Sequence, residues 1–418
     1  MKYDVVVIGG GPAGMMAAGR AGQLGQSVLL LEKNKELGMK LSITGKDRCN
    51  VTHFTEDKNE LIDAYGKNGR FLYSSLAGFS NSDVINFFED RGVKMKVERG
   101  SRVFPVSDKS SDIRQALLAF LAQGKVVIRQ RETVVGIKSF TGESKKTISQ
   151  IALSSGERIK ADKYIITTGG LSYPATGSTG DGYDWARELG HNIINPRPAL
   201  SPIVVSEWFV PQLEGLSLKN IELSIYKDDK KVVSKFGEML FTNAGVSGPV
   251  VLDLSKKVGE LLEAETTTGS VKLRIDLKPA LDFKKLDQRI QRDFQNGNNK
   301  QFKNILENLL PKKFIPVMIL KSKIDPEKQV NLITKEERKR LVKLMKGFSL
   351  QPDKLLGFGK AIITTGGIDL KEVDSKTMQS RLIPNLYFAG EVLDLDGPTG
   401  GYNLQIAWST GYAAGASY

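Results

Sequence analysis

The sequence predicts an α/β fold, in which helices cover a largely parallel sheet and the chain is interrupted by a β-rich insertion with a helical lobe. Three observations predict it. Residues 4–8 form a short apolar run that passes into a glycine turn, a helix of small residues and a second apolar strand. Near the other end, an apolar strand at residues 386–389 also precedes a glycine-rich turn and a helix. From about residue 193 the pattern changes to short alternating strands and then to helical periodicity.

The first turn, GGGPAG, fits the GxGxxG pattern of a Rossmann-like dinucleotide site. In that pattern Gly9 permits a tight turn, Gly11 lets a diphosphate approach the backbone, and Gly14 lets the helix pack against the strand. A helix of small residues is predicted at residues 15–24. The unpaired N–H groups and partial positive charge at its N-terminus, which Pro12 and Ala13 precede, favour a diphosphate. The alternative is a βαβ packing unit that binds nothing.

An acidic residue closes the second strand, and a polar loop follows it. Glu32 lies 23 positions after Gly9, close to the roughly 20 expected of an acid that binds ribose hydroxyls, and Lys33 comes next. Residues 34–52 are rich in Gly, Ser, Thr, Asn and cations, so they can fold back along a bound diphosphate. The side chains expected to line the cofactor are Lys40, Ser42, Thr44, Arg48 and Asn50. A plain surface loop is the alternative.

The composition is ordinary for a soluble globular protein, and its charge is strongly basic. Of the 418 residues 40% are hydrophobic and 26% charged, and no apolar run reaches the ~18 residues of a membrane span. One cysteine, Cys49, favours a reducing cytoplasm, and with only two histidines no metal site is expected. The net charge is +13, and residues 312–346 hold eleven Lys or Arg against four Asp or Glu. This is either a solvated helical face or an attraction for an anionic partner.

Three motifs together resemble one family of flavoproteins. GGGPAG, LGMKLSITGKDRCNVT and GEVLDLDGPTGGYNLQ are similar to the FAD-dependent, NAD(FAD)-utilising dehydrogenase-like proteins, which include aminoacetone oxidase-type and bile-acid dehydro-reductase-type members. The resemblance runs nearly end to end. It departs where the family usually has a glycine run before RCN, because this chain has Lys46 and Asp47 there.

The resemblance implies bound FAD and residues around it. A strand touches the adenine through its backbone at Val134, and the chain returns to the cofactor at Thr168 and Gly169. The closing strand ends at Gly390 and Glu391. The turn and helix start beside the isoalloxazine and ribityl chain comprise Gly401, Tyr402, Asn403 and Leu404. A helix N-terminus aimed at the flavin stabilises its anionic reduced form.

These patterns predict a discontinuous organisation. The FAD-binding domain is expected at residues 1–192 and 358–418, the β-rich inserted domain at 193–281 and 347–357, and the helical lobe at 282–346. Within them, residues 71–88 are predicted to be helical, and Ser247 could cap a helix. The tetrapeptide Thr-Thr-Gly-Gly occurs at residues 167–170 and 364–367. Two strand ends that face one ligand would produce this recurrence, and so would chance.

We expect an FAD-dependent oxidoreductase that transfers electrons between a small organic substrate and NAD(P)H or oxygen. FAD carries the electrons, so no side-chain nucleophile is required, and no catalytic side chain is identified. Only one dinucleotide fingerprint is present, so NAD(P)H would approach the flavin without a motif of its own. One alternative is an FAD-dependent RNA-modifying protein, supported by the basic helical lobe, although no nucleic-acid-binding motif accompanies it. Another is a non-catalytic flavin sensor. The oligomeric state is not predicted.

Overall fold

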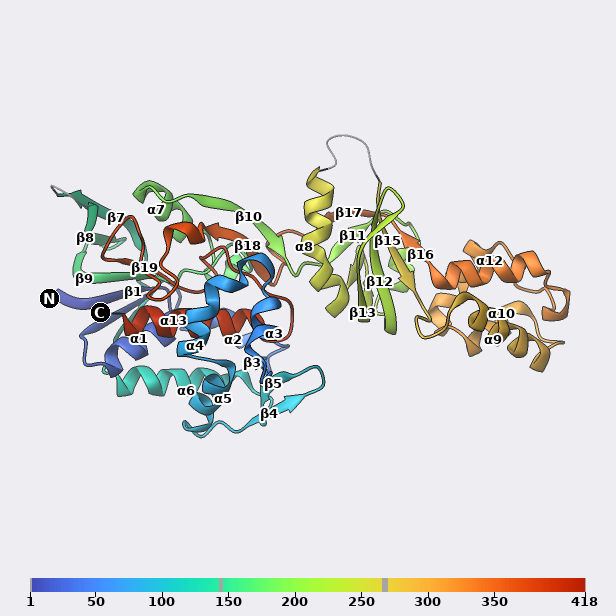
Figure 1. Ribbon diagram of the computed structural model, residues 1–418, viewed down its shortest axis with the longest axis horizontal. Coiled ribbons are helices and arrows are strands. Elements are labelled where there is room, and N and C mark those ends of the chain that lie inside the picture. The colour runs from blue at the N-terminus through green and yellow to red at the C-terminus, as the bar shows by residue number, and fades with distance from the viewer. Residues whose placement is uncertain (1, 143–145, 265–269, 418) are drawn as a thin grey trace. The chain divides into compact units, whose positions relative to one another are not determined.

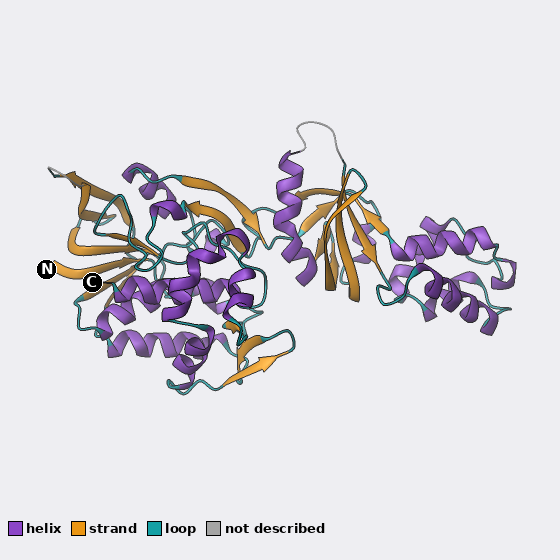
Figure 2. Cartoon of the chain, in the orientation of Figure 1, coloured by secondary structure: helices purple, strands orange, loops and turns teal. Residues whose placement is uncertain are grey.

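The computed structural model describes residues 2–142, 146–264 and 270–417 (Figures 1 and 2). It divides into two compact units. The first, here the cofactor unit, comprises Met1–Pro198 and Phe358–Tyr418, and the second, the inserted unit, comprises Ala199–Gly357. Among the helices described, none is long and apolar enough to cross a membrane.

A mixed sheet forms the centre of the cofactor unit, with strand order β6-β2-β1-β9-β8-β7 and β19 also paired to β9. The pairs β1–β2, β2–β6, β1–β9 and β9–β19 are parallel, and β7–β8 is an antiparallel hairpin. The strands are β1 (Lys2–Ile8), β2 (Val28–Glu32), β6 (Val127–Gln130), β7 (Val134–Thr141), β8 (Lys146–Leu153), β9 (Arg158–Ile166) and β19 (Leu386–Phe388). Residues 5–8 of β1 are all buried, as expected of a central parallel strand.

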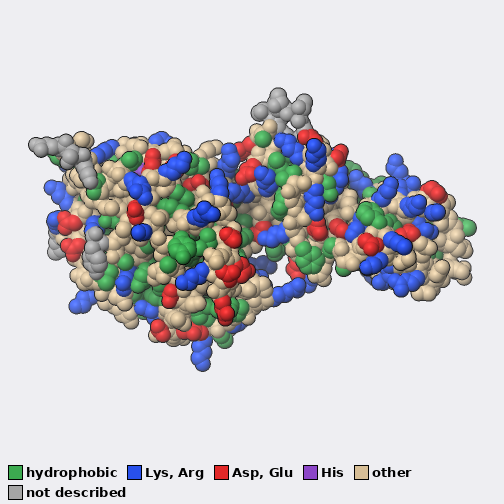
Figure 3. Space-filling model, in the orientation of Figure 1, with side chains coloured by type: hydrophobic (Ala, Val, Ile, Leu, Met, Phe, Trp, Pro, Cys, Tyr) green, Lys and Arg blue, Asp and Glu red, His purple; other side chains and the backbone are tan. Residues whose placement is uncertain are grey.

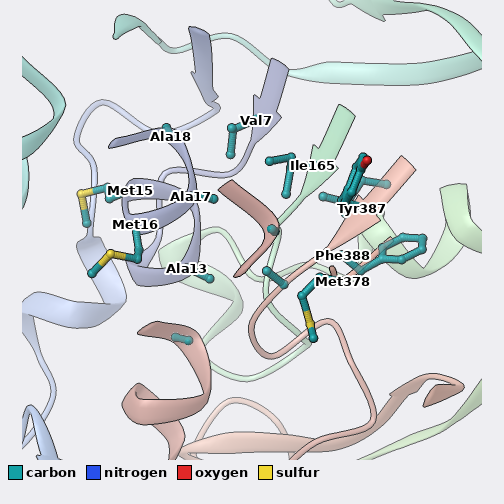
Figure 4. Close-up of a cluster of buried hydrophobic side chains, with 14 of the residues drawn as sticks. Val7, Ala13, Met15, Met16, Ala17, Ala18, Ile165, Met378, Tyr387 and Phe388 are labelled. Carbon is teal, nitrogen blue, oxygen red and sulfur yellow. The ribbon is translucent and has the colours of Figure 1, made fainter. Parts of the chain in front are cut away.

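Helices cover this sheet, and side chains from β1, β9, β19 and α1 meet in the core (Figure 4). The longest are α1 (Pro12–Gln23), α6 (Ser110–Gln123) and α13 (Tyr402–Ala416). The others are α2 (Met39–Ser42), α3 (Lys58–Asp63), α4 (Tyr73–Gly78), α5 (Asn81–Glu89) and α7 (Asp181–Leu189). Smaller sheets pair β3 (Thr52–His53) and β4 (Met95–Glu98) with β5 (Arg102–Pro105), and β10 (Ile193–Ala199) with β18 (Ile363–Ile368).

The helical segment predicted over residues 71–88 is present but interrupted, because the chain breaks between α4 and α5. Ser80 has extended backbone and caps α5, its hydroxyl accepting from the Asp83 N–H. The Asp83 carboxylate in turn accepts from the Ser80 N–H at 2.8 Å, which completes a capping box.

The inserted unit contains an antiparallel sheet of order β16-β15-β12-β13-β14-β11-β17. Its strands are β11 (Ile203–Val205), β12 (Ser217–Lys227), β13 (Lys230–Thr242), β14 (Gly245–Ser247), β15 (Val271–Asp276), β16 (Phe348–Leu350) and β17 (Pro352–Leu355). Helix α8 (Pro249–Glu263) packs on this sheet. Its Val250 packs closely against Gly237 of β13, where an added Cβ would lie 2.7 Å from the valine side chain. The expected Ser247 cap is wrong, since Gly248 is the N-cap residue and makes no side-chain bond.

The helical lobe of the inserted unit consists of α9 (Phe283–Asn296), α10 (Phe302–Ile305), α11 (Ile315–Ser322) and α12 (Lys335–Lys346). Leu286, Ile290 and Phe294 are buried on one face of α9, which confirms their predicted stripe at a spacing of four. Asp282 and Thr334 cap α9 and α12 through side-chain oxygens. The lobe and the sheet share one hydrophobic core.

Candidate cofactor site

The carboxyl ends of four parallel strands lie at one edge of the cofactor unit's sheet. Ile8 at the end of β1 pairs with Leu31 of β2 and with Ile166 of β9, and Ile166 pairs with Phe388 of β19. The segments that follow these strands therefore emerge side by side. They are the glycine turn after β1, Glu32, the turn after β9, and Gly390 with Glu391. This is the edge at which parallel α/β sheets bind ligands.

The glycine turn has the steric pattern that GxGxxG predicts. Gly9 has φ +109°, and a Cβ there would lie 2.6 Å from the Thr167 carbonyl oxygen. A Cβ on Gly14 would lie 1.9 Å from the carbonyl oxygen of Gly9, so the helix packs on the turn only with glycine here. Gly11 differs, because a Cβ there would meet nothing within 4 Å. The space beside Gly11 is open to a ligand.

Glu32 is turned toward this loop. The side chain is 8% exposed, and Oε2 accepts a hydrogen bond from the Gly10 N–H at 2.8 Å. Oε1 accepts from the backbone and the side-chain amide of Asn34, both at 2.8 Å. A carboxylate has about four acceptor positions, so one is left for a ribose hydroxyl. Lys33 points elsewhere, with Nζ 2.7 Å from Asp181 and within bonding distance of Thr179.

Two helices present uncapped N-termini in the same direction. Neither Gly11 at the start of α1 nor Gly401 at the start of α13 provides a side-chain cap, and neither first turn carries an acid. The helices touch through small residues, because a Cβ on Gly411 would lie 2.5 Å from the Ala13 oxygen and one on Gly415 2.3 Å from the Ala17 oxygen. Both contacts advance by four residues, so the helices are parallel.

From these contacts α13 begins eight residues ahead of α1, which is about 12 Å at ~1.5 Å per residue. The partially positive N-termini of α1 and α13 are thus offset by this distance along the helix axes. This arrangement suits a cofactor with a diphosphate at one end and an electron-accepting ring at the other.

The loop after β2 divides into inward and outward side chains. Lys40 forms an ion pair with Glu391 at 2.8 Å, and both side chains are about one-fifth exposed. The hydroxyls of Ser42 and Thr44 donate to backbone oxygens within the loop, at 3.1 and 2.7 Å. Arg48 lies on the outside, where it pairs with Glu98 and Asp108 and covers the ring of Phe104.

Two predicted residues carry buried oxygens without a hydrogen-bond partner among the residues described. They are Asn50 Oδ1 and Thr168 Oγ1. Because a buried polar atom without a partner is costly, such atoms are commonly satisfied by a bound ligand or water. Gly169 follows Thr168 at φ +73°, which turns the chain at the strand end.

Thr364 connects the two Thr-Thr-Gly-Gly segments, and Glu391 fixes it. Glu391 Oε1 accepts from the Thr364 N–H at 2.8 Å. The Thr364 hydroxyl accepts from the N–H groups of Leu171 and Ser172, and a Cβ on Gly170 would lie 2.4 Å from it. The recurrence thus reflects two segments that meet, and Thr364 is a residue that the prediction omitted although the repeated tetrapeptide pointed to it.

The turn before α13 is fixed by Asn403. Its Oδ1 accepts from the Gly397 N–H at 2.9 Å, and its Nδ2 donates to the oxygens of Gly397 and Pro398. Gly401 has φ +101°, and a Cβ there would lie 2.3 Å from the Thr52 backbone. Asn403 and Gly401 therefore shape the turn, whereas Leu404 follows in the first turn of the helix, partly exposed.

The Tyr402 ring belongs to an aromatic cluster that sequence reasoning missed. It stacks on His53 with centroids 4.4 Å apart and meets Tyr65 edge-on at 5.7 Å. The Tyr65 hydroxyl donates to the Tyr402 carbonyl at 3.1 Å. Burial lowers the pKa of His53, so its imidazole is neutral near pH 7. No periodicity in the sequence marks this cluster, because its members lie on three separate segments.

Val134 lies in the β7–β8 hairpin and is buried, opposite Leu153. The residues that precede Val134 contact the end of β2. The N–H groups of Arg131 and Glu132 donate to the carbonyl oxygens of Asn34 and Glu32, respectively, both at 3.0 Å. The hairpin thus starts beside Glu32, the residue predicted to bind a ribose.

Cys49 is fully buried, and burial raises the pKa of its thiol to about 12, so it is protonated at neutral pH. Among residues 2–142, 146–264 and 270–417, no group of His, Cys, Asp or Glu is placed to hold a metal ion.

A family model described as the HI0933-like protein Rossmann domain matches residues 3–417. The chain belongs to the HI0933-like family. The resemblance to FAD-dependent flavoproteins and the Rossmann-like α/β fold class are thereby confirmed. The HI0933-like family is a Rossmann-type family of FAD-dependent flavoprotein oxidoreductases.

Three curated relatives extend over almost the whole HI0933-like chain. The ribosomal RNA dihydrouridine synthases of Escherichia coli and Haemophilus influenzae are 30% and 31% identical, each covering 99% of this chain and 97% of the relative. The 3-dehydro-bile acid delta(4,6)-reductase of Clostridium scindens is 29% identical and covers 98% of this chain and 97% of the relative.

Solved structures with low sequence identity share the fold. A 3-ketosteroid delta1-dehydrogenase from Sterolibacterium denitrificans has a TM-score of 0.55 at 13% identity, covering 99% of this chain and 98% of that one. An open flavocytochrome c3 fumarate reductase has a TM-score of 0.51 at 16% identity, covering 99% and 78%. Both likenesses concern the fold alone.

Proposed function

We propose that this flavoprotein reduces a carbon–carbon double bond conjugated to a carbonyl group. The observation that carries the proposal is that three relatives of matching length bear names that describe one type of reaction on two substrates. Uridine becomes dihydrouridine by reduction of a double bond next to a ring carbonyl. The name of the bile-acid reductase describes reduction of double bonds at positions 4 and 6, which are likewise conjugated to a carbonyl group, here at position 3.

The cofactor would be FAD, which supplies the two-electron chemistry when bound. The open space at Gly11 and the N-terminus of α1 would take the diphosphate, and Glu32 a ribose. Asn50 and Thr168 offer buried oxygens that require partners. The N-terminus of α13 would face the flavin ring and favour negative charge on it.

The remaining predicted contacts are assigned supporting roles. Lys40 and Glu391 hold α2 to the end of β19, and Glu391 also fixes Thr364. Asn403 maintains the turn that starts α13. Arg48 and Lys33 are bound to carboxylates of the protein, so their contribution is to fix the loops beside the site. No side chain is assigned as the proton donor.

We propose RNA uridine as the first substrate candidate and NAD(P)H as the electron donor. The net charge of +13 supports a polyanionic substrate. Residues 282–346 contribute 17 Lys or Arg against 8 Asp or Glu. A small conjugated carbonyl compound is the second candidate, supported by the bile-acid reductase at nearly the same identity.

The experiment is an anaerobic half-reaction on the purified flavoprotein. NADH or NADPH should bleach the flavin absorbance, and an in vitro rRNA transcript should restore it while nucleoside mass spectrometry detects dihydrouridine. The matched control is the same transcript made with dihydrouridine, which offers no double bond. If only a small enone restores the absorbance, the second substrate is correct.

Other outcomes reject the proposal. Flavin that no donor reduces would indicate a sensor without turnover. Flavin that is reduced by an amine and reoxidised only by oxygen would indicate an oxidase.

A further inference from the structure

The helical lobe of the inserted unit carries many cations that lack an acidic partner. Some of the lobe's cations form ion pairs within it: Arg338 lies 2.8 Å from Asp287, and Lys328 lies 2.9 Å from Glu337. Others have no carboxylate within ion-pair distance in the part of the lobe described, and all of these are exposed. They are Lys284, Lys285, Arg292, Lys300, Lys323, Lys335, Lys339 and Lys343. Basic side chains are visible over this lobe in Figure 3.

Three of these cations form a row on α12. Lys335, Lys339 and Lys343 recur every four residues, so they lie on one face of the helix over about 12 Å. We name them the α12 stripe. The apolar face, with Leu341 and Met345, is buried in the lobe. The solvent face is wholly charged, which is unlike a membrane-binding helix that inserts apolar side chains.

An exposed aromatic residue lies on the same unit. Trp208 is 68% exposed, although its neighbour Phe209 is 1% exposed. The Trp208 ring lies 6.1 Å from the Phe209 ring, and Lys321 Nζ is 5.0 Å from the centroid of that same ring. Exposed aromatic rings combined with exposed cations are typical of a surface that stacks bases and contacts phosphates.

The end of α11 joins Trp208 to α12. Lys321 and Ser322 close α11, and Arg340 of α12 donates through Nε to the Ser322 carbonyl at 2.5 Å. Arg340 is the neighbour of Lys339 in the sequence and is exposed. Within the inserted unit, Trp208 is thus connected to α12 through Phe209, the end of α11 and Arg340.

We propose that Trp208 and the α12 stripe form a docking surface for single-stranded RNA. The lysines contact phosphates, and the indole stacks on an unpaired base, which duplex RNA does not offer. The inference rests on the proposed RNA substrate and assigns its binding to a part of the chain outside the cofactor unit. Two acids interrupt the surface: Glu336 is exposed on α12, and Glu207 accepts from the Gln351 N–H at 2.8 Å.

The test uses the full-length flavoprotein and a fluorescein-labelled single-stranded uridine-rich RNA, with anisotropy measured from 50 to 200 mM salt. The triple variant K335Q/K339Q/K343Q should bind more weakly, and the slope of log affinity against log salt should fall by about 2, at ~0.7 per phosphate contact. The control K58Q/K94Q/K160Q removes three exposed lysines from the cofactor unit and should keep the wild-type slope.

Trp208 is tested separately. Trp208→Ala should weaken binding about 5- to 100-fold while leaving the salt slope unchanged, because stacking releases no counterions. Trp208→Phe keeps an aromatic face and should restore most of the affinity. Bound-flavin absorbance and thermal unfolding verify that each variant is folded.

The inference is overturned if the triple variant and its control have equal slopes, or if anionic phosphatidylserine vesicles bind the wild type as tightly as RNA does. Its failure is distinguishable from that of the proposed function. Dihydrouridine formation with unchanged RNA binding in the triple variant would reject only the docking surface. RNA binding that depends on the stripe, without any reduction, would reject only the reaction.

Discussion

Gly11 separates the stability of the glycine turn from its capacity to bind a diphosphate. A side chain at Gly9 or Gly14 would collide with backbone atoms, whereas one at Gly11 would meet nothing within 4 Å. Gly11 also has φ −76°, which any residue adopts without strain. Gly11→Val should therefore fold normally and lose FAD, because the new methyl groups occupy the space assigned to the diphosphate.

The two effects differ in magnitude. Gly11 is the N-cap residue of α1, and replacing a glycine cap with an aliphatic residue costs about 0.5–1 kcal/mol of stability. A steric overlap with the cofactor costs at least the ~3 kcal/mol of severe overpacking, which lowers FAD affinity about 100-fold or more. Stability should change little while cofactor occupancy falls to near zero.

The assay compares the flavin-to-protein absorbance ratio and the urea-unfolding midpoint of the deflavinated proteins. Gly78→Val is the matched control, since Gly78 is exposed with open space around it and lies in α4. Full flavin occupancy in Gly11→Val would refute the diphosphate assignment. Loss of folding in the apoprotein would refute the claim that this position is sterically free.

Three further predictions concern stability. Gly411→Ala should destabilise the protein by about 1–3 kcal/mol in urea unfolding, because its Cβ would lie 2.5 Å from the Ala13 oxygen. Lys46→Gly should stabilise the protein by about 0.5 kcal/mol. Lys46 has φ +58°, so glycine relieves a left-handed cost of ~1–2 kcal/mol and loses part of that gain to the larger entropy of the unfolded chain. Lys46→Ala keeps the strain and should not stabilise the protein. Burial lowers the pKa of His191 below 6.5, so the unfolded state binds more protons than the folded state, and stability falls as the pH drops below about 6.5. His191→Gln should therefore reduce the difference between the unfolding free energies measured at pH 7.5 and pH 5.5.

Backbone-determined features were predictable because local chemistry fixes them. The glycine turn, the strand–helix–strand order and the acid at Glu32 follow from steric limits and spacing, and each is present at the expected residues. The directions of long polar side chains were less accessible. Arg48 lies in the predicted loop, yet its guanidinium pairs with Glu98 and Asp108, which sit 50 and 60 positions away. Only the tertiary fold determines such partners.

Lys46 and Asp47 stand where the resembling family usually has glycines, and both adopt a backbone conformation that favours glycine. Gly45, Lys46 and Asp47 have φ values of +61°, +58° and +64°, so two non-glycine residues occupy the left-handed region that glycine favours. The loop is held from outside, since the Asp47 carbonyl accepts from the Ser110 N–H at 2.8 Å and the Ser110 hydroxyl donates to the Ser42 carbonyl at 2.7 Å. Contacts with the start of α6 thus compensate for the strain of these two left-handed residues.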